Sequence, residues 1–154
     1  MTVNTAAGST VFIGTTMPAS SPAEFEMDYF TEVGEVEDLG EFGDEANEVT
    51  FTSLANRRVR KFKGSFDAGN LEVVCGSDPA DPGQADMIAA MASDLDFNFR
   101  VILNDQITLG GSGTRLYFRG KVMSKRRNVG DVENIVRQTY TVGINTEIYE
   151  VAAT

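Results

Sequence analysis

The chain has 154 residues and a formal net charge of −10 at pH 7, with no histidine, no tryptophan and one cysteine. A chain of this length is expected to form a single domain (1–154), which can bury about 68–70% of its unfolded surface without a metal or disulfide. The charge argues against nucleic acid as a tightly held ligand, because such binding depends on neutralising phosphates.

The first recognisable element is a helical turn over residues 22–29, in which Phe25 and Tyr29 are four residues apart. A polar connection follows over residues 37–63, and it is acidic and rich in glycine in its first half and basic in its second. Compact domains mostly use loops of about 4–6 residues. Residues 37–63 are therefore expected to be disordered or to be ordered by a partner.

Alternation of apolar and polar residues predicts antiparallel strands in the rest of the chain. In three segments every second residue is apolar or glycine and would point to one face of a strand. These residues are Leu71/Val73/Cys75, Phe97/Phe99/Val101/Leu103 and Leu116/Phe118/Gly120/Val122. A long extended segment over residues 135–151 is expected to bend at Gly143. Turn residues at 104–105, 110–113 and 128–131 separate these strands, which indicates an antiparallel sandwich or barrel.

One short helix is expected over residues 82–94, between the strands. Asp81-Pro82-Gly83 supplies a helix start with proline in the first turn. The helix would pack one apolar stripe on the sheet, and the expected core consists of Leu71, Val73, Met87, Ile88, Met91, Phe97, Phe99 and Val101.

The charges are segregated along the chain. Residues 1–56 contain eleven acidic residues and no lysine or arginine, whereas the next eight residues contain Arg57, Arg58, Arg60, Lys61 and Lys63. Two solvated patches of opposite sign would explain this pattern. The alternative is a subunit with complementary faces, which is suited to head-to-tail association.

No catalytic, cofactor or metal motif is found, so the chain is not expected to be an enzyme. Ser112 lies in a glycine-rich turn without an adjacent base, and a serine nucleophile needs one. Asp78, Asp81 and Asp86 do not have the spacing of a calcium loop, and acidic residues at a helix start are ordinary. A free cysteine in a strand, such as Cys75, is usually buried.

No membrane association is expected, because no segment approaches the roughly 18 apolar residues of a membrane span. The first residues lack the basic start and apolar run of a signal peptide. The protein is therefore expected to be made and used in the cytoplasm until a larger assembly exports it.

Five segments, taken in order, resemble the major tail tube proteins of long-tailed, lambda-like bacteriophages. Residues 9–14 resemble the opening strand and 30–39 the second strand of this family, and 48–54 are similar to a segment inside its long loop. Residues 63–73 resemble its entry to the next strand, and Asp78-Pro79-Ala80-Asp81-Pro82-Gly83-Gln84 is similar to its step into the helix.

The resemblance implies a β-sandwich or barrel with one flanking helix, an N-terminal arm (1–10), a stacking loop (37–63) and a C-terminal arm (145–154). It implies hexameric rings that stack into a tube in the virion, after assembly in the host cytoplasm. Phage DNA would pass through the lumen without specific binding. The implied partners are other copies of the chain, a tape-measure protein, a tail terminator and baseplate proteins.

Two sets of residues are expected to serve this assembly. Contacts between rings or subunits are assigned to Arg57, Arg58, Arg60, Lys61, Lys63, Glu41, Asp44, Glu45 and Glu48. Acidic residues that line the lumen and repel DNA are assigned to Glu35, Asp67, Glu72 and Asp96. The alternatives are a soluble carbohydrate-binding or adhesion module, a tail terminator and the inner tube of a contractile system.

Overall fold

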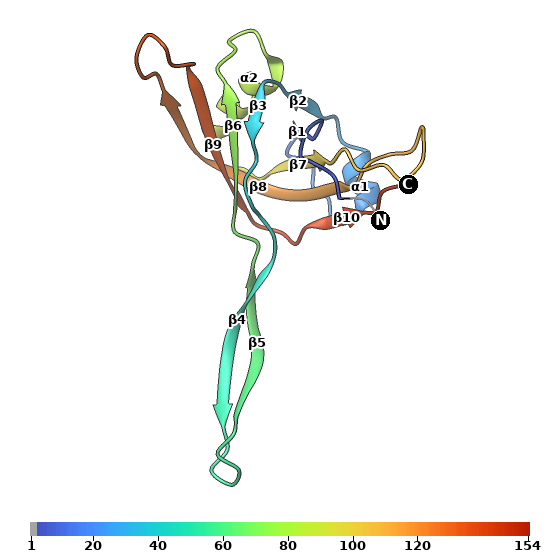
Figure 1. Ribbon diagram of the computed structural model, residues 1–154, viewed down its shortest axis with the longest axis vertical. Helices are drawn as coiled ribbons and strands as arrows, with labels where there is room; N and C mark the ends of the chain where they lie inside the picture. Colours follow the sequence, from blue (N-terminus) through green and yellow to red (C-terminus); the bar gives the residue numbers. More distant parts are fainter. Residues whose placement is uncertain (1–2) are drawn as a thin grey trace.

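The computed structural model describes residues 3–154, as an antiparallel body from which a long hairpin projects (Figure 1). The body sheet has eight strands in the order β2-β1-β7-β8-β9-β6-β3, with β10 paired to β8. The body strands are β1 (Thr10–Ile13), β2 (Thr31–Val33), β3 (Val36–Asp38), β6 (Asn70–Gly76), β7 (Phe97–Ile102), β8 (Arg115–Asn128), β9 (Arg137–Ile144) and β10 (Tyr149–Val151). The hairpin consists of β4 (Glu45–Thr52) and β5 (Val59–Asp67).

One hydrophobic core lies inside the curved sheet. Val11 and Val33 come from one end of the strand order and Leu71 and Val73 from the other, yet all four belong to the same buried cluster. The sheet must therefore curl until its two ends face the same core. Period-two burial runs through the whole of β9, in which every second residue is buried. The expected antiparallel sandwich or barrel is thus confirmed.

The long strand β8 joins the two halves of the body. Its first residues pair with β7 on one side and with β10 on the other, and residues from Gly120 onward pair with β9. The register shifts at Val122–Ser124, so the bulge lies in β8 and not at Gly143. Gly143 instead pairs regularly with Asn70 and Lys121, and a Cβ atom at Gly120 would lie 2.4 Å from its carbonyl oxygen.

Helix α2 (Pro82–Met91) lies against β1, β2 and β8, and it ends three residues before the expected end. Its buried residues are Gly83, Gln84, Met87 and Ala90. The prediction that Ile88 and Met91 belong to the core is wrong, because each is 39% exposed. Phe97 is half-buried at the edge of the core. The helix turns this face to the sheet because its backbone approaches β2 closely at Gly83.

Polar contacts fix α2 in this position. The Asp81 carboxylate accepts hydrogen bonds from the backbone N–H groups of Gln84 and Gly34. The buried Gln84 side chain donates from Nε2 to the carbonyl oxygens of Gly34 and Gly76. The start of the helix therefore bridges the β2–β3 turn and the end of β6.

The substitution Gly83→Ala is expected to destabilise the fold by about 1–3 kcal/mol, because overpacking forces backbone shifts. A Cβ atom at Gly83 would lie 2.0 Å from the carbonyl oxygen of Glu32. At an exposed helix position the same substitution would raise the free energy of unfolding by about 1 kcal/mol. The sign of the measured change therefore tells whether Gly83 packs closely against β2. Urea unfolding followed by circular dichroism measures it, and a more stable variant would contradict the close approach.

A second, five-residue helix, α1 (Pro22–Glu26), covers the outer face of the sheet. It was expected only as a helical turn over residues 22–29. The Phe25 ring is fully buried and lies 5.5 Å from both Tyr117 and Tyr149, measured between ring centroids. Tyr117 is therefore buried although it points away from the main core, whereas Tyr29 is exposed.

A hydrogen-bond network beside α1 explains why Asn98 is buried on the same outer face. The Asp28 carboxylate accepts from the Thr15 backbone and hydroxyl and from Asn98 Nδ2, at 2.6–2.8 Å. Burial raises the pKa of Asp28, but these hydrogen bonds outweigh it, so the pKa lies below its ordinary value. The ionised carboxylate thus holds the 15–28 connection on the sheet.

The described terminal segments contact the body. The C-terminal segment 145–154 was expected to be an extended arm, but β10 pairs with β8 and the Thr154 N–H donates to the Ser112 carbonyl. Residues 1 and 2 of the expected N-terminal arm lie outside the described residues, and the Ala7 carbonyl accepts from Asn104 Nδ2. Within residues 3–154, neither helix is long and apolar enough to cross a membrane.

Candidate interaction surfaces

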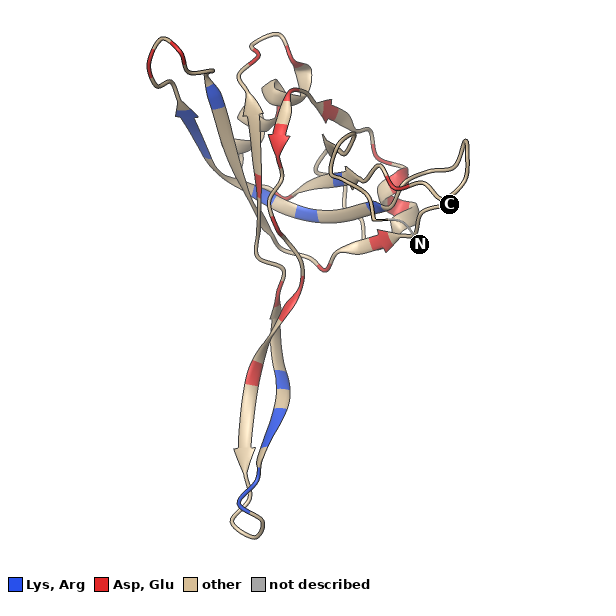
Figure 2. Ribbon diagram, viewed as in Figure 1, with Lys and Arg blue, Asp and Glu red and all other residues tan. Residues whose placement is uncertain are grey.

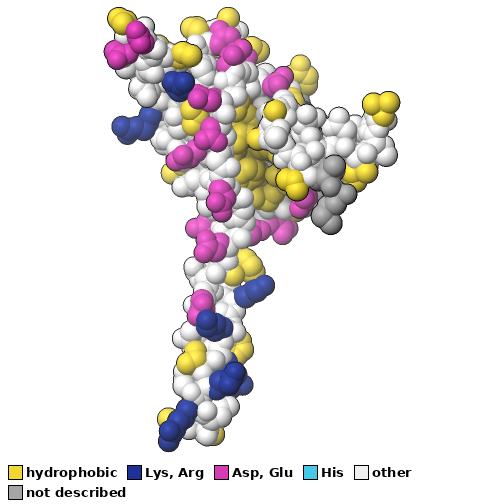
Figure 3. Space-filling model, in the orientation of Figure 1, with side chains coloured by type: hydrophobic (Ala, Val, Ile, Leu, Met, Phe, Trp, Pro, Cys, Tyr) yellow, Lys and Arg dark blue, Asp and Glu magenta, His cyan; other side chains and the backbone are white. Residues whose placement is uncertain are grey.

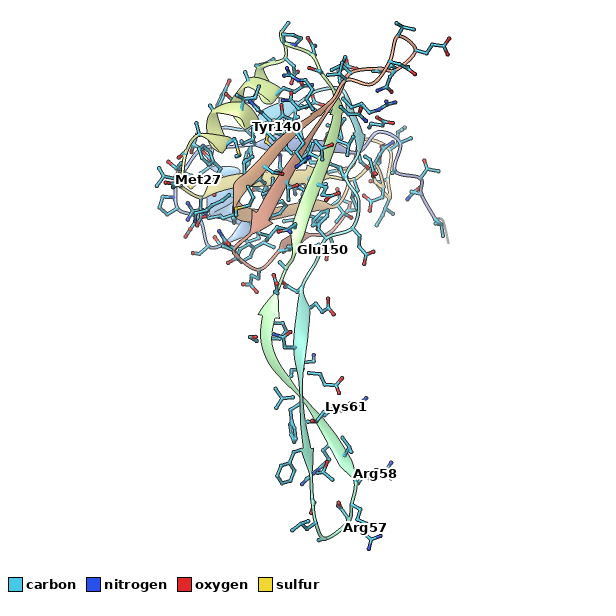
Figure 4. All side chains as sticks on the ribbon, turned by 90° about the vertical axis from the view of Figure 1, so that its left-hand side faces the viewer. Met27, Arg57, Arg58, Lys61, Tyr140 and Glu150 are labelled. Atoms are coloured by element: carbon cyan, nitrogen blue, oxygen red, sulfur yellow. The ribbon has the colours of Figure 1, made fainter. Side chains whose placement is uncertain are left out.

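Residues 37–63 were expected to form a loop, and most of them instead form the projecting hairpin. After β3 the chain runs through residues 39–44 into β4, turns at 53–58 and returns as β5. Figure 2 shows that the lysine and arginine positions of this hairpin lie in its outer part. All five predicted basic contact residues are there, with Arg57 and Arg58 at the turn and Lys61 farther along β5 (Figure 4).

The hairpin has two chemically different faces. Residues directly paired across antiparallel strands point to the same side. Val49 pairs with Phe62 and Phe51 with Arg60, so these four residues form one face, which we call the apolar face. The opposite face includes the paired residues Glu48/Lys63 and Thr50/Lys61.

Neither face of the hairpin is covered in the single chain. Side chains of Val49, Phe51 and Phe62 are 51–54% exposed, and Leu54 at the turn is 99% exposed. The Arg60 guanidinium lies over the Phe51 ring, 5.3 Å from its centroid. An isolated two-stranded hairpin is marginally stable at best in water. The apolar face is therefore available to a partner.

The basic residues of the hairpin are almost free of partners within residues 3–154. The one ion pair they form joins Lys61 and Glu48 at 3.9 Å, with both side chains more than half exposed. Such exposed pairs contribute about 0–1 kcal/mol. The predicted contact residues Glu45 and Glu48 lie on β4, where Glu48 pairs with Lys63 but Glu45 pairs with Asp67. Glu41 and Asp44 precede the hairpin.

An apolar groove opens in the body near the base of the hairpin (Figure 3). The groove has a volume of about 440 Å³. Its apolar walls are Val36, Leu39, Phe42, Val101, Leu103 and Leu116. Phe42 is held there by contact with Phe118, at 5.9 Å between ring centroids. The acidic residues Glu37, Asp38 and Glu41 also line this groove.

The rim charges of the groove are partly unpaired. Glu37 forms an ion pair with Arg137. Neither Asp38 nor Glu41 forms an ion pair among the described residues. Glu41 was predicted to be a contact residue, whereas the groove was not predicted. The sequence feature that indicates the groove is the set of apolar residues at positions 36, 39 and 42 within an otherwise polar segment.

The four lumen candidates do not form one acidic patch. Glu72 is exposed in the middle of β6, while Glu35 and Asp67 lie near its two ends. Asp96 directly precedes β7, which is separated from β6 by β8 and β9 in the sheet. Lys121 Nζ lies 2.8 Å from its carboxylate. Hydrogen bonding from Lys121 is the main cause that lowers the pKa of Asp96.

The outward face of β6, β9 and β8 carries both signs of charge. Glu72 pairs with Thr141, which points away from the core between the buried residues Tyr140 and Val142. By the same alternation, Lys121 and Arg126 point outward opposite Gly143 and Thr139. This face is polar and mixed in charge.

Neither a metal cluster nor a reactive thiol is found in the described part of the chain. In residues 3–154 no group of three or more carboxylate, histidine or cysteine side chains is arranged to hold a metal ion. Cys75 is fully buried in the core, where burial raises the pKa of its thiol to about 11. A thiol in that state is a poor nucleophile.

Comparison with known proteins identifies the fold. No family model matches the sequence, and no curated protein matches it. Among solved structures, a chain of the anti-feeding prophage baseplate has a TM-score of 0.71 and 11% identity, with 100% of this chain and 99% of that chain covered. A chain from the sheath/tube terminator structure of the PVC extracellular contractile injection system has a TM-score of 0.68 and 14% identity, with 99% of both chains covered.

The SPP1 tail tube has the same fold, with a TM-score of 0.62 and 13% identity over 93% of this chain and 77% of that chain. The expected likeness to tail tube proteins is thus confirmed at the level of the fold. The fold also occurs in components of contractile injection systems, and it is shared over nearly the whole chain.

Proposed function

We propose that the chain is the structural subunit of a tail tube, in which six copies form a ring and the rings stack. The projecting hairpin is the observation that carries the proposal, because its apolar and basic side chains have almost no partners in the single chain. The fold shared with the SPP1 tail tube supports it. The six-fold symmetry of the anti-feeding prophage baseplate supports a six-membered ring.

Ring formation would satisfy the open edges of the sheet. β2 and β3 are its outermost strands, and β8 extends past the end of its pairing with β7. Exposed strand edges favour pairing with another chain, and closure into a ring removes them. Six copies that joined their sheets in this way would form a continuous inner wall.

Stacking would use the hairpin. The basic residues Arg57, Arg58, Arg60, Lys61 and Lys63 would contact the acidic residues Glu41, Asp44, Glu45 and Glu48 of a copy in the adjacent ring. The N-terminal segment (1–10) and the C-terminal segment (145–154) would serve as further contacts between rings. Opposite charges at such contacts favour one orientation of association over others.

The lumen would conduct phage DNA during ejection without binding it. Glu35, Asp67, Glu72 and Asp96 are the proposed lining residues, and the net charge of −10 would repel the phosphates. The tube would end at a tail terminator and at a baseplate and would enclose a tape-measure protein. Its place would be the virion, after assembly in the host cytoplasm.

A role in a contractile system is the second candidate. The chains from the anti-feeding prophage and from the PVC system have higher TM-scores, 0.71 and 0.68, than the SPP1 tail tube, 0.62. The inner tube or the terminator of such a system would use the same ring. A binding module is less well supported, since Phe42 is the one aromatic side chain among the described residues that line the groove, which gives a sugar ring little to stack on.

Negative-stain electron microscopy of the purified protein tests the proposal. Rings or hollow tubes are expected as protein concentration rises, and fewer of them at high salt because the screening length shortens from about 8 Å to 3 Å between 0.15 M and 1 M. Single rings that never stack would favour the terminator. Particles that stay monomeric at every concentration and salt would contradict a tube subunit and favour the binding module.

A further inference from the structure

We propose that the apolar groove of the body is the receptor for the apolar face of the hairpin from a second copy of the chain. The proposal rests on the tube function, and it deepens it by naming the surface that each hairpin occupies. Val49, Phe51 and Phe62 would enter the groove, and Arg60 would lie over its acidic rim.

The two surfaces match in polarity. The groove exposes parts of Val36, Leu39, Leu103 and Leu116 to water, and the apolar face of the hairpin exposes its aromatic rings. A volume of about 440 Å³ lies in the range of pockets that enclose ligands of several rings. Contact between the two would remove both sets of side chains from water.

The two surfaces also match in charge. Residues 53–63 of the hairpin carry five positive charges and no negative charge. The groove is lined by Asp38 and Glu41, neither of which forms an ion pair among the described residues. The groove therefore presents unpaired negative charges beside apolar surface, and the hairpin presents positive charges beside apolar surface. This complementarity favours the basic hairpin over an acidic or neutral segment as the occupant of the groove.

The occupant must come from another copy. The chain leaves the groove at Phe42, and β4 begins three residues later and runs away from the body (Figure 1). The apolar face therefore points to surroundings outside its own body. An open chain of such contacts is head-to-tail, which generates a stack and not a closed dimer.

Disulfide trapping between two variants tests this contact. One variant carries Ser9→Cys in the groove wall, and the other carries Val49→Cys on the hairpin. The native thiol does not interfere, because Cys75 is fully buried. Variants of different mass are mixed, assembled and oxidised, and the mixed dimer is measured by denaturing electrophoresis. The control replaces Ser9→Cys with Val132→Cys, at a fully exposed loop position of the body.

A mixed dimer is expected for the groove pair and not for the control pair, since disulfide formation needs Cα atoms within about 7 Å. Adding Asp38→Lys and Glu41→Lys to the groove variant is expected to reduce the dimer. A second readout is Phe62→Trp, the only tryptophan in that chain. Its emission should shift to shorter wavelength on assembly, and not when the rim charges are reversed.

The outcomes separate the contact from the tube. Tubes with the groove dimer support both. Tubes without the dimer and without the emission shift overturn the groove contact and leave the tube standing. A dimer with only short, unclosed chains in the microscope supports the groove contact and overturns the hexameric tube. Absence of dimer, shift and tubes overturns both.

Discussion

The substitution Phe99→Ala is expected to lower the free energy of unfolding by about 3–5 kcal/mol, the cost of deleting a buried aromatic ring. Phe99 is fully buried in β7, where it pairs with Ile13 of β1 and with Phe118 of β8. Its ring stacks on that of Phe118 with centroids 5.5 Å apart. Because the strands on both sides are fixed by hydrogen bonds, the cavity cannot collapse fully.

Urea unfolding of the unassembled protein, followed by circular dichroism, measures this loss. Phe62→Ala is the matched control, because it deletes the same ring from a half-exposed position on the hairpin. Surface substitutions usually change stability by about 0.5 kcal/mol or less. Equal losses for the two variants would contradict the assignment of Phe99 to the core and of Phe62 to a free surface.

The body strands could be predicted because one face of each is buried. Burial forces apolar residues to recur at every second position, and this pattern is visible in β6, β7, β8 and β9. The same rule failed on the outer face. Tyr117 and Asn98 occupy positions that alternation assigns to solvent, but α1 and the 15–28 connection cover them. Alternation alone carries no information on what covers the second face.

The hairpin escaped prediction for the opposite reason, because neither face is buried in the single chain. Val49 and Phe51 alternate with polar residues, but the surrounding acidic and glycine-rich segment indicated a loop. β4 forms a strand because it pairs with β5, and in most of these pairs the two residues are eight or more positions apart in the sequence. The alternation typical of a strand was present in the sequence, but the polar and glycine-rich composition around it favoured a loop.

The face of α2 depends on backbone proximity, which hydrophobicity does not encode. Met87, Ile88 and Met91 form the more apolar stripe, but the helix packs through Gly83, Gln84, Met87 and Ala90. Close approach to β2 needs small residues, and Gln84 is buried because it finds two carbonyl acceptors. A glycine at the second helical position was the available signal.

The groove could not be predicted from the sequence, because its walls come from four separate segments. Residues 6–9, 36–42, 101–103 and 116 meet only after the sheet has curled. Charge segregation did indicate complementary faces, and the structure collects the basic residues at the end of one projection. Which face of the sheet would line the proposed lumen depends on how neighbouring copies pack, so the lining residues cannot be read from the alternation of one chain.

Reversal of two hairpin charges, Arg58→Glu with Arg60→Glu, is expected to reduce tube assembly by more than tenfold while the monomer stays folded. Neither arginine forms an ion pair in residues 3–154, so the monomer loses only the contact of Arg60 with Phe51, about 0.5–1 kcal/mol. Each exposed charge pair between copies contributes roughly 0.2–1 kcal/mol. Two such pairs in each of six proposed hairpins add up to roughly 2–12 kcal/mol between rings.

Every 1.4 kcal/mol is about a tenfold change in association, so even the lower bound shifts assembly beyond tenfold in protein concentration. Sedimentation and electron microscopy of assembled material measure the change, and circular dichroism verifies the fold. The charge-conserving variant Arg58→Lys with Arg60→Lys is the matched control and should still assemble. Assembly of the reversed variant at the wild-type concentration would show that these charges are merely solvated, and that any stacking depends on the apolar face alone.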